Sequence, residues 1–280
     1  MSATPIGWVD GHLVGDRPAL RAHDHGVTVG DGVFETCSVR RGGVFALTRH
    51  LRRLRRSAAG LGLPEPDLDL VRSGVTAVLA AEPLAFGRVR ITLTGGPGPL
   101  GSDRADVPPT YVVLASPVPR PSPTTAVAVV PWVRNERSPV VGLKTTSYVE
   151  NVVALAYARE RGATEALMAN TRGELCEGTG SNVLLAIAGK LMTPPLTSGA
   201  LGGITRELLL EWALDEGLAI HERAIPMDDV ALADEVALTS STRDVQAVHR
   251  VDERALSAPG PLVAAAAAVF ARRAAADIDP

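Results

Sequence analysis

The sequence predicts a mixed α/β (α+β) fold in two domains, and three features support this prediction. Segments such as GVFETCSVR alternate in the way typical of strands, whereas other segments repeat apolar residues at helical spacing. Both hairpins and helices separate the expected strands. The segment SPVPRPSPT (116–124) is rich in proline, which continues neither a helix nor a central strand, so we expect an interdomain linker there. The expected domains are a small N-terminal α/β domain over 1–115 and a larger C-terminal domain over 125–280.

The N-terminal domain is expected to begin with a hairpin in GWVDGHLV, where Asp10 and Gly11 supply the turn. Thr48 is placed to N-cap a helix that runs to about Ser57. The other expected elements are a strand in 32–40, a short strand VFAL in 44–47, a helix at 67–81 and strands near 88–94 and 110–115. Between the last two strands lies TGGPGPLGSDRADVPP, a long loop of the kind that often carries function.

In the C-terminal domain, Ser147 and Glu150 form a capping box before a helix that runs to about Arg161. Gly162 is the stop signal of that helix. The further expected elements are strands in EALMAN, ELCEG, NVLLAIA and EVALTSS, a helix opened by GGITRELLLEWAL, and a C-terminal helix in VAAAAAVFARRAAA.

Composition excludes several classes of function. The 280 residues are 46% hydrophobic and 21% charged with a net charge of −3, which gives no electrostatic reason to expect nucleic acid or a membrane as partner. No apolar run reaches the length of a membrane span, and the N-terminus lacks the pattern of a secretory signal. Cys37 and Cys176 make neither a metal spacing nor a disulfide framework. We therefore expect a soluble cytoplasmic enzyme without a metal.

Lys144 is the first candidate catalytic residue. The chain has 28 lysines and arginines together, and Lys144 and Lys190 are the only lysines. Lys190 lies in AIAGKLM, where a hairpin lysine exposed to solvent is the simplest interpretation. Lysine, unlike arginine, can lose its proton and act as a base or nucleophile. Composition alone leaves Lys144 either as a catalytic amine or as one more surface cation.

If Lys144 forms a Schiff base with a cofactor, a phosphate site and a carboxylate for a pyridine nitrogen are also needed. Gly202 and Gly203 precede a helix, and the free N–H groups of a helix N-terminus favour an anion. Thr205 adds a hydroxyl. Glu177, at the end of a short strand, is a candidate for the carboxylate. An ordinary glycine turn and a solvated carboxylate remain the alternatives for these segments taken alone.

Six motifs in order carry a resemblance to a known family. They are GDGVFET, HLRRL, LKTTSYVENVVALAYA, RGELCEGTGSNVLL, LMTPPLTSGALGGITR and ALTSS, over about 24–248. Together they resemble the class IV aminotransferases, the fold type IV enzymes that use pyridoxal 5'-phosphate (PLP), and most of all the D-amino acid aminotransferases. The resemblance implies a small N-terminal domain, a larger domain around a barrel-like sheet, PLP between them, and a homodimer.

The resemblance also implies residue roles. Lys144 matches the Schiff-base lysine that later moves a proton, and Glu177 matches the carboxylate on the pyridine nitrogen. Tyr148 resembles the tyrosine that hydrogen-bonds the cofactor's phenolic oxygen, although it follows the lysine at a spacing one residue shorter. The residues that match phosphate ligands are Arg53, Ile204, Thr205, Ser240 and Ser241. Periodicity alone does not distinguish Arg53 from the other arginines of its helix.

Three residues bear on the substrate. D-Amino acid aminotransferases carry a tyrosine at the position of Phe34. They also carry an Arg-x-His pair in the loop that holds Arg104, and in this chain Asp106 stands in place of that histidine. Arg90, which alternates with apolar neighbours, is placed to hold a substrate carboxylate. Arg90 and Arg104 could equally be surface arginines. The chain also lacks the GGNY that follows the lysine in many branched-chain enzymes.

These features predict an aminotransferase that moves an amino group from a D-amino acid to a 2-keto acid, with a specificity that extends to (R)-amines. One alternative is aminodeoxychorismate lyase, which eliminates pyruvate, and another is an L-branched-chain aminotransferase. A third alternative is a catalytically silent cofactor-binding protein. The presence of both Lys144 and Glu177 argues against the third, because binding alone would not need both.

Overall fold

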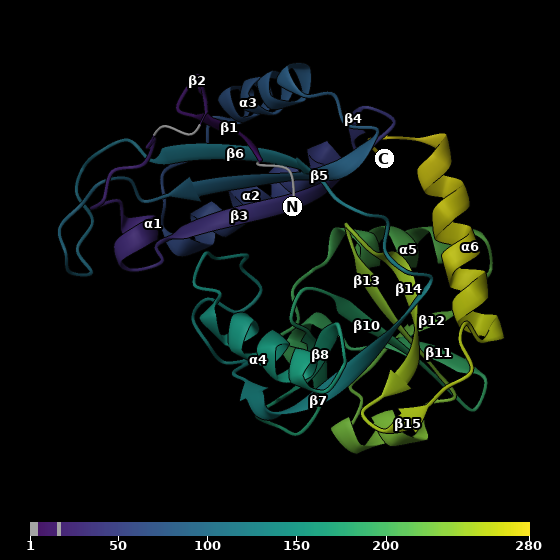
Figure 1. Ribbon diagram of the computed structural model, residues 1–280. Coiled ribbons are helices and arrows are strands. Elements are labelled where there is room, and N and C mark those ends of the chain that lie inside the picture. The colour runs from purple at the N-terminus through teal and green to yellow at the C-terminus, as the bar shows by residue number, and fades with distance from the viewer. Residues whose placement is uncertain (1–4, 16–17) are drawn as a thin grey trace. The chain divides into compact units, whose positions relative to one another are not determined.

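The computed structural model describes residues 5–15 and 18–280, which form two compact units (Figure 1). The first unit runs to Arg120 and also includes Leu143–Ser147 and Ile278–Pro280. The second unit comprises Pro121–Gly142 and Tyr148–Asp277. Each unit combines a sheet with helices, so the mixed α/β class predicted from the sequence is confirmed. The short segment that holds Lys144 belongs to the first unit, although the chain on both sides of it belongs to the second.

The first unit is built on a six-stranded antiparallel sheet with the order β2-β1-β6-β5-β3-β4. Its strands are β1 (Ile6–Val9), β2 (His12–Val14), β3 (Gly32–Arg40), β4 (Gly43–Val44), β5 (Phe86–Thr94) and β6 (Thr110–Pro117). Its helices are α1 (His25–Thr28), α2 (Leu47–Leu61) and α3 (Leu68–Ala81). The core lies on one face of the sheet, where Val33 and Ile91 pack with Leu51 and Leu54 of α2.

The second unit is built on a nine-stranded mixed sheet with the order β12-β11-β10-β13-β14-β7-β8-β9, in which β15 pairs with β14. β9 also contacts β10, so the sheet curls round its own core. The strands are β7 (Thr124–Arg134), β8 (Glu165–Asn170), β9 (Leu175–Gly178), β10 (Asn182–Ile187), β11 (Lys190–Thr193), β12 (Ile220–Glu222), β13 (Glu235–Ser240), β14 (Asp244–Val251) and β15 (Arg254–Ala255).

Three α-helices cover this sheet: α4 (Val149–Glu160), α5 (Ile204–Asp215) and α6 (Pro261–Ala276) (Figure 1). Helix α4 packs against β7 and β8, where Ala154 and Ala158 meet Ala128. Helices α5 and α6 pack on each other, with the rings of Trp212 and Phe270 5.3 Å apart. Two short 3-10 helices, Leu196–Ser198 and Met227–Leu232, complete the elements of this unit.

The N-cap expected at Thr48 is wrong. Helix α2 begins at Leu47, two residues before the start that an N-cap at Thr48 would give, and its N-cap residue Ala46 has a left-handed backbone with φ 52° and no side-chain cap. The Asp279 carboxylate accepts instead from the Thr48 N–H at 2.8 Å and from the Thr48 hydroxyl at 2.6 Å. A carboxylate from the C-terminus therefore satisfies a free N–H of the first turn, where the helix dipole also favours negative charge.

The capping box expected at Ser147 and Glu150 is also wrong. The Ser147 hydroxyl donates to the Gly30 carbonyl at 3.0 Å, and α4 starts after Tyr148 without a side-chain cap. Two predictions that depend on glycine agree with the structure. The hairpin turn at Asp10-Gly11 is confirmed, and Gly162 follows α4 with a φ of 66°, a left-handed conformation that favours glycine.

Candidate active site

Glu35, His50 and Arg53 form a buried polar cluster in the first unit. Alternation along β3 puts Glu35 on the same face of the sheet as the core residue Val33, and this face packs against α2. Arg53 donates from Nε to Oε1 of Glu35 at 2.8 Å and from Nη2 to Oε2 at 2.6 Å. Nδ1 of His50 lies 2.6 Å from the same Oε2. The bidentate pairing fixes the plane of the guanidinium.

The charges of this cluster follow from its burial. Burial by itself would raise the pKa of the Glu35 carboxyl, but Arg53, with a contribution from His50, lowers this pKa to about 2. Burial lowers the pKa of His50, against the opposing effect of Glu35. At neutral pH Glu35 is therefore a carboxylate, and His50 is a neutral imidazole whose Nδ1–H donates to it.

Burial separates Arg53 from the other arginines of α2. Arg53 is only 4% exposed, whereas Arg52, Arg55 and Arg56 are exposed and Arg49 is half-buried. A buried arginine has to be paired, and Glu35 provides the charge partner. Alternation along β3 predicts a strand but does not by itself mark Glu35 as a functional residue. The available signal was a glutamate on the apolar face of that strand.

Lys144 is attached to the first unit through the backbone of β3. Its carbonyl accepts from the Phe34 N–H at 2.9 Å, and its own N–H donates to the Ser57 hydroxyl at 3.2 Å. An antiparallel bridge between Val33 and Thr145 continues this attachment. The segment therefore adds a short strand-like edge to β3, which fixes the backbone position of the lysine.

Two cationic side chains of the first unit lie close to the ring of Phe34. Nζ of Lys144 lies 4.5 Å from the centroid of the Phe34 ring, and Cζ of Arg90 lies 3.7 Å from it. Phe34 pairs with Thr92 and Thr36 pairs with Arg90, so Phe34 and Arg90 are diagonal neighbours on the sheet face opposite Glu35. The structure thus brings together Lys144 and two of the three predicted substrate residues, within cation–π distance of one ring.

The third predicted substrate residue, Arg104, has different partners. It donates from Nε and Nη2 to the two carboxylate oxygens of Asp31 at 2.7 and 2.6 Å. Nη2 also donates to the Leu61 carbonyl at 2.9 Å, and Nη1 donates to the Gly62 carbonyl at 2.8 Å. The hydrogen bond from Arg104 in turn lowers the pKa of Asp31. These four bonds use most of the donors of the guanidinium. Arg104 therefore ties its loop to the C-terminus of α2.

Glu177 lies at the end of β9 in the second unit and is 9% exposed. Its Oε2 accepts from the Leu201 N–H at 2.9 Å, and its Oε1 is 3.5 Å from Nε of Arg134. Asn182, at the start of β10, donates from Nδ2 to the Leu201 carbonyl at 2.8 Å. Both backbone groups of Leu201 are therefore held by side chains, and the loop before α5 is tied directly to Glu177.

The N-terminus of α5 carries Ile204 and Thr205, both buried. The N-cap residue is Gly203, and no side chain caps this helix. A Cβ on Gly203 would collide with Oδ1 of Asn182, so only glycine fits while Asn182 keeps its position. The N–H groups of a first helical turn have no partner within the helix, which makes such a helix start suitable for an anion.

Ser240 and Ser241 lie at the same end of the sheet as this helix start. β13 ends at Ser240, and Thr239 pairs with Asn182. Asn182 in turn contacts the loop before α5. The second unit therefore places Ser240 and Ser241 at the same end of its sheet as the N-terminus of α5.

Tyr148, at the start of α4, donates its hydroxyl proton to the Thr179 carbonyl at 2.7 Å. Asn151 donates from Nδ2 to the same carbonyl at 2.6 Å. A carbonyl has no proton to give, so Tyr148 is the donor in this bond. Since a phenol carries one proton, the Tyr148 oxygen in this arrangement is an acceptor toward any third group.

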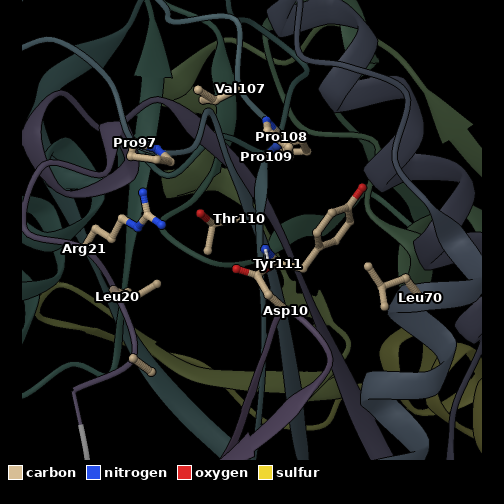
Figure 2. A pocket seen from close by; sticks show the side chains of 11 residues that line it. Asp10, Leu20, Arg21, Leu70, Pro97, Val107, Pro108, Pro109, Thr110 and Tyr111 are labelled. Carbon is tan, nitrogen blue, oxygen red and sulfur yellow. Dashed lines mark hydrogen bonds between the residues drawn. The ribbon is translucent and has the colours of Figure 1, made fainter.

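A hollow of about 490 Å³ in the first unit lies between the loop before β6 and the segment that contains Arg21 (Figure 2). Its polar lining is largely satisfied by the protein itself. The Asp10 carboxylate accepts from the Tyr111 N–H at 2.8 Å, the Tyr111 hydroxyl accepts from the Asp67 N–H, and the Thr110 hydroxyl donates to Asp24. We assign no ligand to this hollow.

Comparison with known proteins identifies the family. The family described as amino-transferase class IV matches residues 32–251. A bifunctional aminodeoxychorismate lyase / D-amino acid transaminase of Mycobacterium tuberculosis is 31% identical over 266 residues, which cover 85% of this chain and 88% of the relative. The solved branched-chain aminotransferase of Thermoproteus uzoniensis with norvaline has a TM-score of 0.88 and 29% identity, and the match covers 96% of this chain and 94% of that one. An aminotransferase of Mycobacterium tuberculosis described as hypothetical, in its PLP-bound form, has a TM-score of 0.84 and 30% identity over 95% of this chain and 97% of that one.

The chain belongs to the class IV aminotransferase family. It is a PLP-dependent transaminase, and its substrates are an amino donor and a keto acid. Over the residues that the structure describes, no helix is long and apolar enough to cross a membrane, and no cluster of potential metal ligands occurs.

Proposed function

We propose that this transaminase takes its amino group from D-amino acids and, with relaxed specificity, from (R)-amines, and passes it to a 2-keto acid. The observation that carries the proposal is the arrangement of Lys144 and Arg90 at the ring of Phe34. An amine that can act as a base and a guanidinium that can hold a carboxylate therefore both lie within cation–π distance of one ring. The similarity to a D-amino acid transaminase supports the D-specific assignment.

The donor set of the second unit fits PLP. The helix start at Gly203–Thr205 offers N–H groups and a hydroxyl to a phosphate, and Glu177 offers a carboxylate to the pyridine nitrogen. The hydrogen bond between Leu201 and Glu177 fixes these two parts relative to each other. We assign Ile204, Thr205, Ser240 and Ser241 as phosphate ligands in this unit. The assignment of Arg53 as a phosphate ligand rests on the family resemblance.

When bound, PLP supplies an aldehyde that carries the amino group and a ring that accepts electrons from the substrate carbon. Lys144 would hold the cofactor through its side-chain amine and would act as the base that takes the proton from Cα of the amino donor. Glu177 holds a proton on the pyridine nitrogen. Arg90 would bind the carboxylate of an amino acid donor. Phe34 provides an apolar surface beside both.

The partners of Arg104 support the relaxed specificity. The guanidinium of Arg104 donates to Asp31 and to two backbone carbonyls, so we assign the substrate carboxylate to Arg90 without help from this second arginine. A donor that lacks a carboxylate then loses the contribution of one residue rather than two. This argument favours acceptance of (R)-amines alongside D-amino acids.

The test is an absorbance spectrum of the purified holoenzyme before and after addition of D-alanine or, separately, of L-leucine, without a keto acid. We expect D-alanine to bleach the band of the lysine-bound cofactor and L-leucine to leave it unchanged. Bleaching by L-leucine alone would overturn the D-specific assignment. The second candidate is aminodeoxychorismate lyase, which the bifunctional relative favours. Release of pyruvate from aminodeoxychorismate by a protein that responds to neither amino acid would support it.

We also propose that the enzyme is a homodimer in which each subunit helps to close the other's site. A particle of twice the chain mass of 29.2 kDa in light scattering is the expected result. A particle of 29.2 kDa that is fully active at the same concentration would contradict it.

A further inference from the structure

Glu165 is a buried carboxylate, 3% exposed, that no residue role so far includes. It stands at the start of β8 and faces the turn that follows β9. Its oxygens accept from the Thr179 N–H at 2.9 Å, the Gly180 N–H at 3.3 Å and the Ser181 hydroxyl at 3.0 Å, and also from the Thr179 hydroxyl. The carboxylate thus accepts four hydrogen bonds from the turn, and such charge-assisted bonds are among the stronger ones in proteins.

The same turn determines where Tyr148 sends its proton. Glu165 binds the N–H and hydroxyl of Thr179, and the Thr179 carbonyl accepts from Tyr148 and from Asn151. A shift of the turn would therefore move the acceptor of the Tyr148 proton. Tyr148 would then be able to turn its hydroxyl toward another acceptor.

Glu177 is coupled to this turn through the chain. It precedes Thr179 by two residues, and the Gly178 N–H donates to the Ser181 carbonyl at 2.8 Å, which closes the turn directly after β9. The strand end that carries Glu177 and the acceptor of Tyr148 therefore share one anchor. That anchor is Glu165.

We propose that Glu165 is a positioning residue of the transaminase. Its carboxylate holds turn 179–181 so that the Thr179 carbonyl takes the proton of Tyr148, which leaves the Tyr148 oxygen as a hydrogen-bond acceptor toward the cofactor. The proposal rests on the assignment of Tyr148 as a cofactor ligand. It predicts that loss of Glu165 changes the reaction through Tyr148, in addition to any loss of stability.

The chain offers a matched control. Glu235 is also a buried glutamate of the second unit, 6% exposed, and it accepts from the Leu262 and Val263 N–H groups at 3.1 and 2.8 Å. It stands at the end of β13 away from Ser240. Glu165→Gln and Glu235→Gln therefore remove the same kind of charge from the same kind of site, but only the first alters turn 179–181.

The experiment compares Glu165→Gln, Tyr148→Phe, their combination and Glu235→Gln by the rate of the half-reaction, by PLP affinity and by amide hydrogen exchange of the apoenzyme. We expect Glu165→Gln to speed exchange at residues 178–182, and Glu165→Gln and Tyr148→Phe each to lower the rate about tenfold. The double variant should fall no further than the slower single variant, and Glu235→Gln should keep the wild-type rate.

Three results would overturn the proposal. Glu165→Gln could lose stability as Glu235→Gln does while it keeps the wild-type rate and PLP affinity, which would make its role structural. The effects of Glu165→Gln and Tyr148→Phe could multiply, which would exclude a route through Tyr148. Tyr148→Phe could be without effect. A wild-type enzyme that ignores D-alanine would instead contradict the D-amino acid assignment, and exchange and PLP affinity would still test Glu165.

Discussion

Arg53 and Glu35 form a bidentate ion pair inside the first unit, with N–O distances of 2.8 and 2.6 Å. The pair connects α2 to β3, and His50 of α2 forms a further hydrogen bond with Glu35. The arginine that we assign to the cofactor phosphate is therefore oriented by a carboxylate from a neighbouring strand. A pair so deeply buried makes stability depend on the ionisation of both partners.

Acid should destabilise the protein because of this pair. The pKa of Glu35 falls from 4.5 to about 2 on folding, so the stability it contributes is complete above pH 4.5 and is lost as the pH falls toward 2. This shift corresponds to about 3 kcal/mol of unfolding free energy. The lowered pKa of His50 acts in the same direction, because the unfolded chain takes up that proton first below pH 6.5. Urea unfolding from pH 7 to pH 3 measures the loss.

Glu35→Gln is the control for this acid effect. It leaves the buried Arg53 without a counter-charge and should lower stability at pH 7 by roughly 3–5 kcal/mol. It should also reduce the change in unfolding free energy between pH 4.5 and pH 3, since the titrating carboxyl is gone. An unchanged slope in Glu35→Gln would show that other carboxylates carry the acid sensitivity.

Lys144→Ala should stop turnover and preserve the fold. The lysine backbone is held by Phe34 and Ser57, and these bonds do not depend on the side chain. Loss of a general base typically costs about 10²–10⁴ in rate, so we expect a loss of at least about 100-fold. Lys190→Ala, at the exposed start of β11, is the matched control and should be fully active. Single-turnover rates with D-alanine measure the effect, and a Lys144→Ala enzyme with more than a tenth of the wild-type rate would refute the assignment.

Gly203→Ala should weaken PLP binding. The added Cβ would displace the Asn182 side chain, which donates to the Leu201 carbonyl at 2.8 Å. Losing a buried hydrogen bond costs about 1–3 kcal/mol, which corresponds to a roughly 5- to 150-fold higher Kd. Titration of the apoenzyme with PLP gives the value. Gly101→Ala, where nothing lies within 4 Å of the new Cβ, should bind as the wild type does. Equal affinities of the two variants would mean that Asn182 adapts freely.

The fold class and the local glycine signals were predictable from the sequence, whereas contacts between distant segments were not. Hairpin and helix-stop signals depend on φ at single residues, so Gly11 and Gly162 could be recognised locally. The caps at Thr48 and Ser147 failed because Asp279 and Gly30, far away in the chain, take part instead. No local pattern encodes such partners.

In the candidate site, too, contacts between distant segments could not be predicted from the sequence. Periodicity could not select Arg53 from the arginines of α2, because its burial depends on Glu35 from another element. The resemblance of motifs selected it, and its burial agrees with a special role. Alternation along the strand named Arg90 as a candidate and the family resemblance named Phe34, but their contact depends on the register of β3 with β5. Glu165 gave no signal at all, because its partners follow a different strand.

Arg90→Gln should lower activity with amino donors that carry a carboxylate more than activity with donors that lack one. Arg90 is the guanidinium beside Phe34 and Lys144, so its loss should remove a charged hydrogen bond to an amino acid donor but not to an (R)-amine. Charge-assisted hydrogen bonds contribute about 1.5–3 kcal/mol, so kcat/KM for D-alanine should fall by roughly 10- to 150-fold. Arg88→Gln, two residues earlier on β5 and exposed, controls for the loss of a positive charge on the same strand. Steady-state kinetics with D-alanine and with an (R)-amine measure the difference. Because the (R)-amine makes no carboxylate contact, an equal fall for both donors would mean that Arg90 acts on Lys144 rather than on the substrate carboxylate.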